Sequence, residues 1–124
     1  MTIVQVAQRA TDLDRAEDFY RRLLGVEPAA RFDPPGLLFF VVDGVRLLLE
    51  PGAPSSLLYL RTDDLDARVA ALEAEGVRIT ASPHEIYEHA DDSLGPAGTV
   101  ERMAFFEDSE GNTVALVEQR PRSA

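Results

Sequence analysis

The chain states one sequence pattern twice. The segment ATDLD at 10–14, a helical stretch and the GV pair at 25–26 return about 52 positions later as TDDLD at 62–66, a second helical stretch and GV at 76–77. Each copy then closes with a hairpin-like run, at 39–50 and at 105–118. A duplication of this size predicts two similar modules that share one sheet system, with a site between them.

The length of 124 residues fits a single compact domain. We therefore expect the two copies to be halves of one domain over residues 1–124. Module one is expected to span 1–52 and module two 53–124. The link PGAPSS at 51–56 breaks both helical and strand periodicity but is too short to separate independent domains.

Composition removes several classes of function. The chain has no cysteine, which excludes disulfides and thiolate chemistry, and no lysine, which excludes Schiff-base chemistry at a lysine amine. Its net charge of −10 opposes binding to nucleic acid. The N-terminus lacks a basic leader, and no apolar run approaches the roughly 20 residues of a membrane span. We expect a cytoplasmic protein with a small-molecule partner, and neither a nucleic acid nor a membrane.

Local signals predict the elements of each module. Asp12 or Asp14 is expected to cap a first helix that ends at Gly25, and Gly76 is expected to stop a second helix over 66–75. The Asp43-Gly44 pair predicts a tight hairpin between 37–42 and 45–50, and residues 29–32 could add another short strand. The stretch 81–100, with two prolines and both histidines, is expected to be a long functional loop. The end, 121–124, is expected to be a loose tail.

These features together resemble the glyoxalase, bleomycin-resistance and extradiol-dioxygenase superfamily, also called the vicinal oxygen chelate superfamily. The resemblance rests on the doubled pattern, the DLD that opens each helix, and FEDSEGN at 106–112 leading to LVE at 116–118. SPH at 82–84 and MAFF at 103–106 resemble a glyoxalase-like branch. The resemblance implies an α+β fold of two tandem βαβββ modules that form a cupped, partly open mixed sheet. It also implies a homodimer.

The resemblance further implies a divalent metal held by the first and last strands of each module. The matching places are Gln5 and Leu57 on the first strands and Glu50 and Glu118 at the ends of the last. Gln5, Glu50 and Glu118 are oxygen ligands, His84 is a further candidate, and Leu57 cannot bind a metal. Residues two apart in a strand share a face, so each glutamate ends an otherwise apolar row.

The ligand types decide the chemistry that such a site would support. Oxygen ligands favour Mg²⁺ or Mn²⁺, whereas recruitment of His84 favours Zn²⁺, Ni²⁺ or Co²⁺. The metal would polarise a carbonyl, with Glu118 or Glu50 as general base, which suits an isomerase, epimerase or lyase acting on a small 2-oxo or 2-hydroxy compound. The set does not match the two histidines and one carboxylate that hold Fe(II) in extradiol dioxygenases.

A second class of function fits the same resemblance. Proteins like the bleomycin-resistance proteins bind no metal and sequester a cationic drug, and both Leu57 and the net charge of −10 agree with that class. Within either class, one member of each phenylalanine pair, 39–40 and 105–106, is expected to line a cleft. Both histidines are expected to make surface hydrogen bonds, and Asp108, Gly111 and Asn112 are expected to form a turn.

Overall fold

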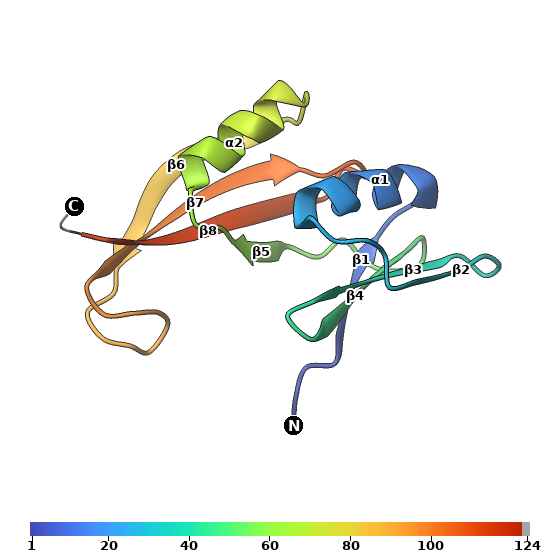
Figure 1. Cartoon of the computed structure of the whole chain (residues 1–124), viewed down its shortest axis with the longest axis horizontal. Coiled ribbons are helices and arrows are strands. Elements are labelled where there is room, and N and C mark those ends of the chain that lie inside the picture. The colour runs from blue at the N-terminus through green and yellow to red at the C-terminus, as the bar shows by residue number, and fades with distance from the viewer. Residues whose placement is uncertain (123–124) are drawn as a thin grey trace. The chain divides into compact units, whose positions relative to one another are not determined.

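The computed structural model describes residues 1–122 and divides the chain into two compact units (Figure 1). Unit 1 holds Met1–Ser56 together with the short segment Asp108–Asn112, and unit 2 holds Leu57–Glu107 and the chain from Thr113 onward. The division falls after Ser56, a few residues beyond the expected boundary at 52. The single-domain expectation stays a prediction.

Unit 1 is a four-stranded mixed sheet with one helix. Its sheet has the order β1-β4-β3-β2, with β1 parallel to β4 and the other pairs antiparallel. Asp43 and Gly44 both adopt positive φ angles, 48° and 78°, so the predicted tight turn joins β3 and β4. The elements in chain order are β1 (Gln5–Arg9), α1 (Leu13–Leu24), β2 (Ala30–Phe32), β3 (Leu37–Val42) and β4 (Val45–Glu50).

Capping residues set both ends of α1. The Asp12 carboxylate accepts a hydrogen bond from the Arg15 backbone N–H, and Gly25 ends the helix with a left-handed φ of 71°. The buried residues of α1 include Phe19 and Tyr20, and the Tyr20 ring packs 6.4 Å from Phe40 of β3. One face of the unit 1 sheet is therefore covered by α1, and we call the opposite face the open face.

The segment Asp108–Asn112 completes the core of unit 1. Tyr20, which is fully buried, donates its hydroxyl hydrogen bond to Asp108 at 2.5 Å. Burial and the neighbouring Asp108 carboxylate both raise the pKa of Tyr20, so the phenol stays neutral. The Asn112 side chain donates to the Arg9 carbonyl, and Asp108 accepts two backbone N–H groups of its own turn. The prediction that these residues form a turn is confirmed.

Unit 2 repeats the order of unit 1. Its sheet runs β5-β8-β7-β6, with β5 parallel to β8 and the other pairs antiparallel. Asp64 caps α2 as Asp12 caps α1. The doubled βαβββ fold is thus confirmed as two open four-stranded mixed sheets. The elements are β5 (Leu58–Arg61), α2 (Leu65–Ala74), β6 (Ile79–Glu88), β7 (Thr99–Glu107) and β8 (Thr113–Pro121).

The expected loop over 81–100 is wrong for its first half. Residues 79–88 form β6, whose pairing with β7 shifts register in three places, including between Ala81 and His84. The bulged strand accommodates Pro83, which cannot donate to a regular ladder, and only 89–98 lies outside strands. The expected loose tail is wrong at Pro121, which ends β8; Ser123 and Ala124 lie outside the described residues.

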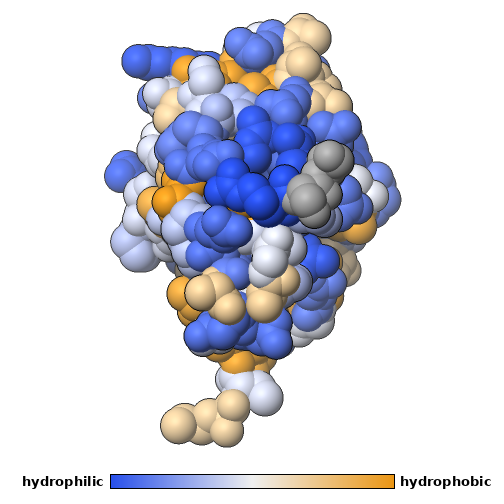
Figure 2. Space-filling view, turned by 90° about the vertical axis from the view of Figure 1, so that its left-hand side faces the viewer, coloured by the Kyte–Doolittle hydropathy of each residue, from blue (hydrophilic) through white to orange (hydrophobic). Residues whose placement is uncertain are grey.

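Among residues 1–122, no helix is long and apolar enough to cross a membrane. The face shown in Figure 2 is mostly hydrophilic, with apolar residues in small groups. This agrees with a chain in which 27% of the residues are charged.

Candidate functional site

The open face of the unit 1 sheet carries two of the predicted metal ligands. Gln5 pairs with Arg46 and Ala7 pairs with Leu48, so Gln5 shares a face with Leu48 and with Glu50, two residues further along β4. Neither Gln5 nor Glu50 has a side-chain partner within the described chain. Glu50 lies four residues beyond the partner of Gln5, which is roughly 13 Å along the strand. The two side chains therefore occupy the two ends of this face.

The α2 helix covers one face of the unit 2 sheet, and the opposite face, the open face of unit 2, carries a row of rings. Tyr59, Ala115 and Phe105 stand side by side on β5, β8 and β7. The rings of Tyr59 and Phe105 are 6.3 Å apart edge to face, and His84 of β6 stacks on Phe105 at 6.4 Å. The small Ala115 is fully buried between its neighbours, while Tyr59 is 55% exposed. This row is an aromatic surface that a flat apolar group can stack on.

The two members of each phenylalanine pair differ in burial, and the cleft that one of them was expected to line stays a prediction. Phe40 and Phe106 are fully buried on the helix-covered faces, whereas Phe39 and Phe105 are half-buried on the open faces. Leu57, which matches Gln5 in the repeat, is 45% exposed just before β5. Leu57 adds apolar surface there and offers no donor atom.

Glu118 lies on the other face of its sheet. It pairs with Arg102 of β7 and shares the α2-covered side with Leu116 and Val114. The Leu65 backbone N–H at the start of α2 donates to Glu118 Oε2 at 2.9 Å. Glu118 is only 2% exposed, so the prediction that it faces an open hollow together with Glu50 is not met.

Two arginines saturate the Glu118 carboxylate. Glu118 Oε1 lies 3.1 Å from Arg102 Nη1 and 3.2 Å from Arg120 Nε, and Arg120 Nη2 reaches Oε2 at 3.4 Å. Asp66 of α2 supplies the second negative charge beside the two arginines. The hydrogen bond from Arg102 lowers the pKa of Asp66, although desolvation acts in the opposite direction. With the Leu65 N–H, all four acceptor positions of Glu118 are taken. A cation would have to displace a guanidinium to bind there.

The two histidines differ in their surroundings. His84 is exposed, and its Nδ1 lies 2.8 Å from the Ser82 carbonyl oxygen. His89 is only 3% exposed, which corrects the expectation that it lies at the surface. Its Nε2 lies 2.9 Å from Glu101 Oε1, and Gly95 packs so closely that a Cβ there would meet the His89 ring at 2.8 Å. His89 therefore anchors the loop 89–98.

The predicted ligand set does not fit a metal at Glu118. Within unit 2, Glu118 and His84 lie on opposite faces of the sheet, because His84 pairs with Met103 and Glu118 with Arg102. Within unit 1, Gln5 and Glu50 sit at opposite ends of their face. Over the described part of the chain, no group of three or more His, Asp or Glu side chains is arranged to hold a metal ion. The metal cofactor stays a prediction.

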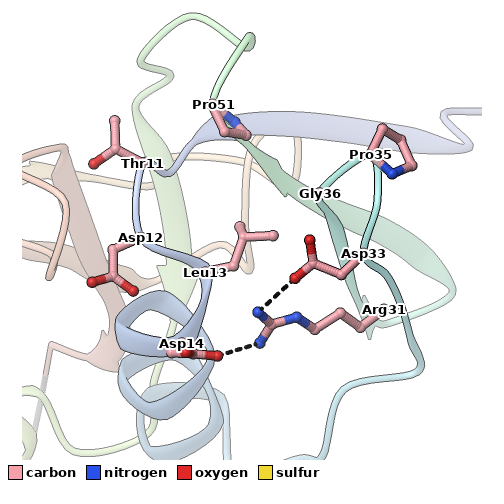
Figure 3. Close-up of a pocket in the computed structure, with 9 residues that line it drawn as sticks. All are labelled: Thr11, Asp12, Leu13, Asp14, Arg31, Asp33, Pro35, Gly36 and Pro51. Atoms are coloured by element: carbon pink, nitrogen blue, oxygen red, sulfur yellow. Dashed lines mark hydrogen bonds and ion pairs between the residues drawn. The ribbon is translucent and has the colours of Figure 1, made fainter.

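A separate pocket of about 380 Å³ opens in unit 1 (Figure 3). The Arg31 side chain in it pairs with Asp14 at 2.9 Å and with Asp33 at 3.1 Å. These hydrogen bonds raise the pKa of Arg31. The positive charge of Arg31 is therefore balanced by carboxylates of the same chain. The other lining residues are Thr11, Asp12, Leu13, Pro35, Gly36 and Pro51.

Sequence reasoning missed the arginines of the open faces. Arg9 and Arg46 point to the open face of unit 1, and Arg61 points to that of unit 2. The signal was present, because Arg9 and Arg61 stand at the same place in the two copies, each three residues before a capping aspartate.

Comparisons with known proteins give a family and a fold. A family model described as "Glyoxalase/Bleomycin resistance protein/Dioxygenase superfamily" matches residues 2–116. No protein with a curated description matches the chain.

Solved structures of similar fold span almost the whole chain. An antibiotic-binding protein, TnmS3, from a Streptomyces species is 26% identical, with a TM-score of 0.67 and coverage of 96% of both chains. A lactoylglutathione lyase from Agrobacterium tumefaciens is 24% identical, with a TM-score of 0.66 and coverage of 94% of this chain and 92% of that one. A superfamily member from Sphaerobacter thermophilus is 24% identical, with a TM-score of 0.71 and coverage of 95% and 97%.

Proposed function

Because the chain belongs to the glyoxalase/bleomycin resistance protein/dioxygenase superfamily, we propose that it is a metal-independent small-molecule binding protein. The ligand would rest on the open face of the unit 2 sheet, where the ring row of Tyr59, Phe105 and His84 offers a stacking surface.

One observation carries this choice over a metalloenzyme. The carboxylate of Glu118, which the predicted metal site uses as a ligand and as one of two candidate bases, is buried under α2 with two guanidinium partners and a backbone N–H. A carboxylate in that environment stabilises the fold, and moving it to a metal would leave Arg102 and Arg120 with Asp66 as their one shared carboxylate. The likeness to an antibiotic-binding protein also supports the binding class, whereas the lyase supports only the fold.

Metal analysis separates the two classes. We expect the purified protein to contain far less than one equivalent of Mg, Mn, Zn, Ni or Co, and we expect none of these ions to raise its melting temperature. A ligand that binds the native state but not the unfolded state raises the melting temperature by mass action, so a bound metal would be detected as an increase in melting temperature. A stoichiometric metal whose removal abolishes ligand binding would overturn the proposal and restore the metalloenzyme.

Ligand binding in the presence of a chelator is the complementary test. We expect aromatic small molecules to bind in EDTA, and we expect Tyr59→Ala to weaken that binding, because Tyr59 supplies the most exposed ring of the row. Tyr87→Ala is the matched control, since Tyr87 packs on His89 rather than on Phe105. Equal losses in the two variants would contradict the location of the site.

A further inference from the structure

Apart from Arg68, which makes contacts of its own, the arginines of this chain fall into two groups. With 22 acidic and 12 basic residues, carboxylates are in excess, and most of the guanidinium groups are in ion pairs. Those with ion pairs are Arg15, Arg21, Arg22, Arg31, Arg78, Arg102, Arg120 and Arg122. Arg9, Arg46 and Arg61 make no side-chain hydrogen bond or ion pair within residues 1–122, and all three are exposed.

The three unpaired arginines all lie on open faces of sheets, two in unit 1 and one in unit 2. Arg9 pairs with Glu50 and Arg46 pairs with Gln5, which places both on the open face of unit 1. Arg61 pairs with Val117 and follows Tyr59 by two residues, which places it on the open face of unit 2. Each open face thus joins an apolar centre to at least one guanidinium without a partner.

The acidic residue of the unit 1 open face does not neutralise its arginines. Glu50 stands across from Arg9 without forming an ion pair, so Arg9 and Arg46 share this face with one free carboxylate. The open face of unit 1 therefore carries a local positive excess in a chain whose net charge is −10. On the open face of unit 2, Glu101 is hydrogen-bonded to His89 at 2.9 Å and Glu107 is paired with Arg78 at 3.6 Å, so neither carboxylate is in an ion pair with Arg61. Local potential, rather than net charge, decides which ligand a face attracts.

We propose, resting on the proposed function, that the ligand is an organic anion: a flat apolar body with a carboxylate. Within unit 1, the body would stack on Phe39 and the carboxylate would be bound by Arg9. Within unit 2, the body would stack on the ring row and the carboxylate would be bound by Arg61. Guanidinium suits this role because its planar fork matches a carboxylate with two parallel hydrogen bonds. This differs from the expectation of a cationic ligand, which rested on the resemblance to bleomycin-resistance proteins and on the net charge.

Three probes with one ring system test the sign of the ligand charge. We would titrate 2-naphthoate, 2-naphthylmethanol and 2-naphthylmethylammonium into the wild-type chain in EDTA at low ionic strength. The naphthoate is expected to bind about tenfold more tightly than the neutral alcohol, and the ammonium more weakly than either. Salt should weaken binding of the naphthoate and leave that of the alcohol almost unchanged.

Arginine variants identify which guanidinium binds the carboxylate of the ligand. Arg9→Gln and Arg61→Gln are expected to keep the wild-type melting temperature, because neither guanidinium has a partner to lose. At least one of them should weaken naphthoate binding by about threefold to tenfold without changing that of the alcohol. Arg78→Gln removes the same charge at an exposed ion pair before β6 and is expected to change neither.

The outcomes distinguish this inference from the function beneath it. Binding of the alcohol or the ammonium as tightly as the naphthoate, with the variants silent, would overturn the anionic ligand and leave a small-molecule binder. A loss in the Arg9 and Arg61 variants no larger than in the Arg78 variant would also overturn it. Failure of all three probes to bind would overturn both proposals.

Discussion

Glu110 shows how one side chain can hold two distant parts of the sequence together. Its carboxylate accepts hydrogen bonds from the backbone N–H groups of Thr11 and Asp12 and pairs with Arg15 at 2.8 Å. Burial raises the pKa of Glu110, but the hydrogen bonds from Arg15, Asp12 and Ser109 outweigh it and lower that pKa to about 2. The charged form is therefore the one that stabilises the native state.

This shift has a definite sign in acid stability. A carboxyl group whose pKa is lower in the folded state contributes stability above its unfolded pKa, near 4.5, and loses it as the pH falls toward about 2. Glu110→Gln is expected to lower the melting temperature at pH 6, with a loss of about 1–3 kcal/mol of unfolding free energy. The gap between wild type and variant should close as the pH falls from 4.5 to 2.

Thermal melts across pH 2 to 7 measure that gap. Glu73→Gln, an exposed substitution on α2, is the control and should track the wild type at every pH. A gap for Glu110→Gln that stays constant from pH 6 to pH 2 would contradict the assigned role.

At the residue scale, the sequence predicted backbone chemistry better than side-chain direction. Two helices are capped by Asp12 and Asp64, and the tight turn forms at the Asp43-Gly44 pair. These features follow from local sequence because caps and tight turns depend on a few neighbouring atoms. The predicted direction of the Glu118 side chain was not met, because successive side chains of a strand point to opposite faces of the sheet. Glu50 ends β4 and lies on an open face, whereas Glu118 is followed by three more residues of β8 and lies on a helix-covered face, because the two copies differ by one position in where the glutamate falls.

At the element scale, Glu118 binds α2 to its sheet. Its carboxylate accepts from the first N–H of the helix and balances Arg102 and Arg120, whose other partner is Asp66 in the first turn of α2. A negative charge at a helix N-terminus is favourable, and here it is buried as well. The position of α2 on its sheet therefore depends on this one ion-pair cluster.

Glu118→Gln is expected to destabilise the chain by about 3 kcal/mol. The amide N–H₂ would be forced against a guanidinium or the Leu65 N–H, and breaking a buried ion pair leaves uncompensated charge. Urea denaturation followed by circular dichroism measures the change. Glu107→Gln, in the half-exposed pair with Arg78, should cost less than about 1 kcal/mol. Similar losses in both variants would show that Glu118 is not the anchor described.

The missed strand β6 has a physical cause at this same scale. Pro83 and the three register shifts against β7 interrupt the alternation that marks a strand, and the exposure of residues 84–88 removes the apolar signal. Pairing with the well-formed β7 holds the segment as a strand, and such tertiary support is not visible in local sequence.

At the scale of the whole molecule, the two sequence modules and the two compact units are not the same division. The segment Asp108–Asn112 lies in the second module of the sequence but belongs to unit 1. It supplies Asp108 to the buried Tyr20 hydroxyl, Asn112 to the Arg9 carbonyl and Glu110 to the start of α1. Unit 1 therefore needs a piece of chain that the repeat assigns to the other copy.

A fragment of residues 1–56 is accordingly expected not to fold cooperatively. Without Asp108 the Tyr20 hydroxyl would be buried with no acceptor there, and the N–H groups of Thr11 and Asp12 would lose Glu110; each such loss costs about 1–3 kcal/mol. Their sum is comparable to the whole stability of a small unit, about 5 kcal/mol at the low end. Circular dichroism melts of the fragment beside the full chain test this, with Tyr20→Phe in the full chain as the measure of one lost contact. A sharp melting transition in the fragment would mean that unit 1 folds without the segment Asp108–Asn112, and that the duplicated halves fold independently.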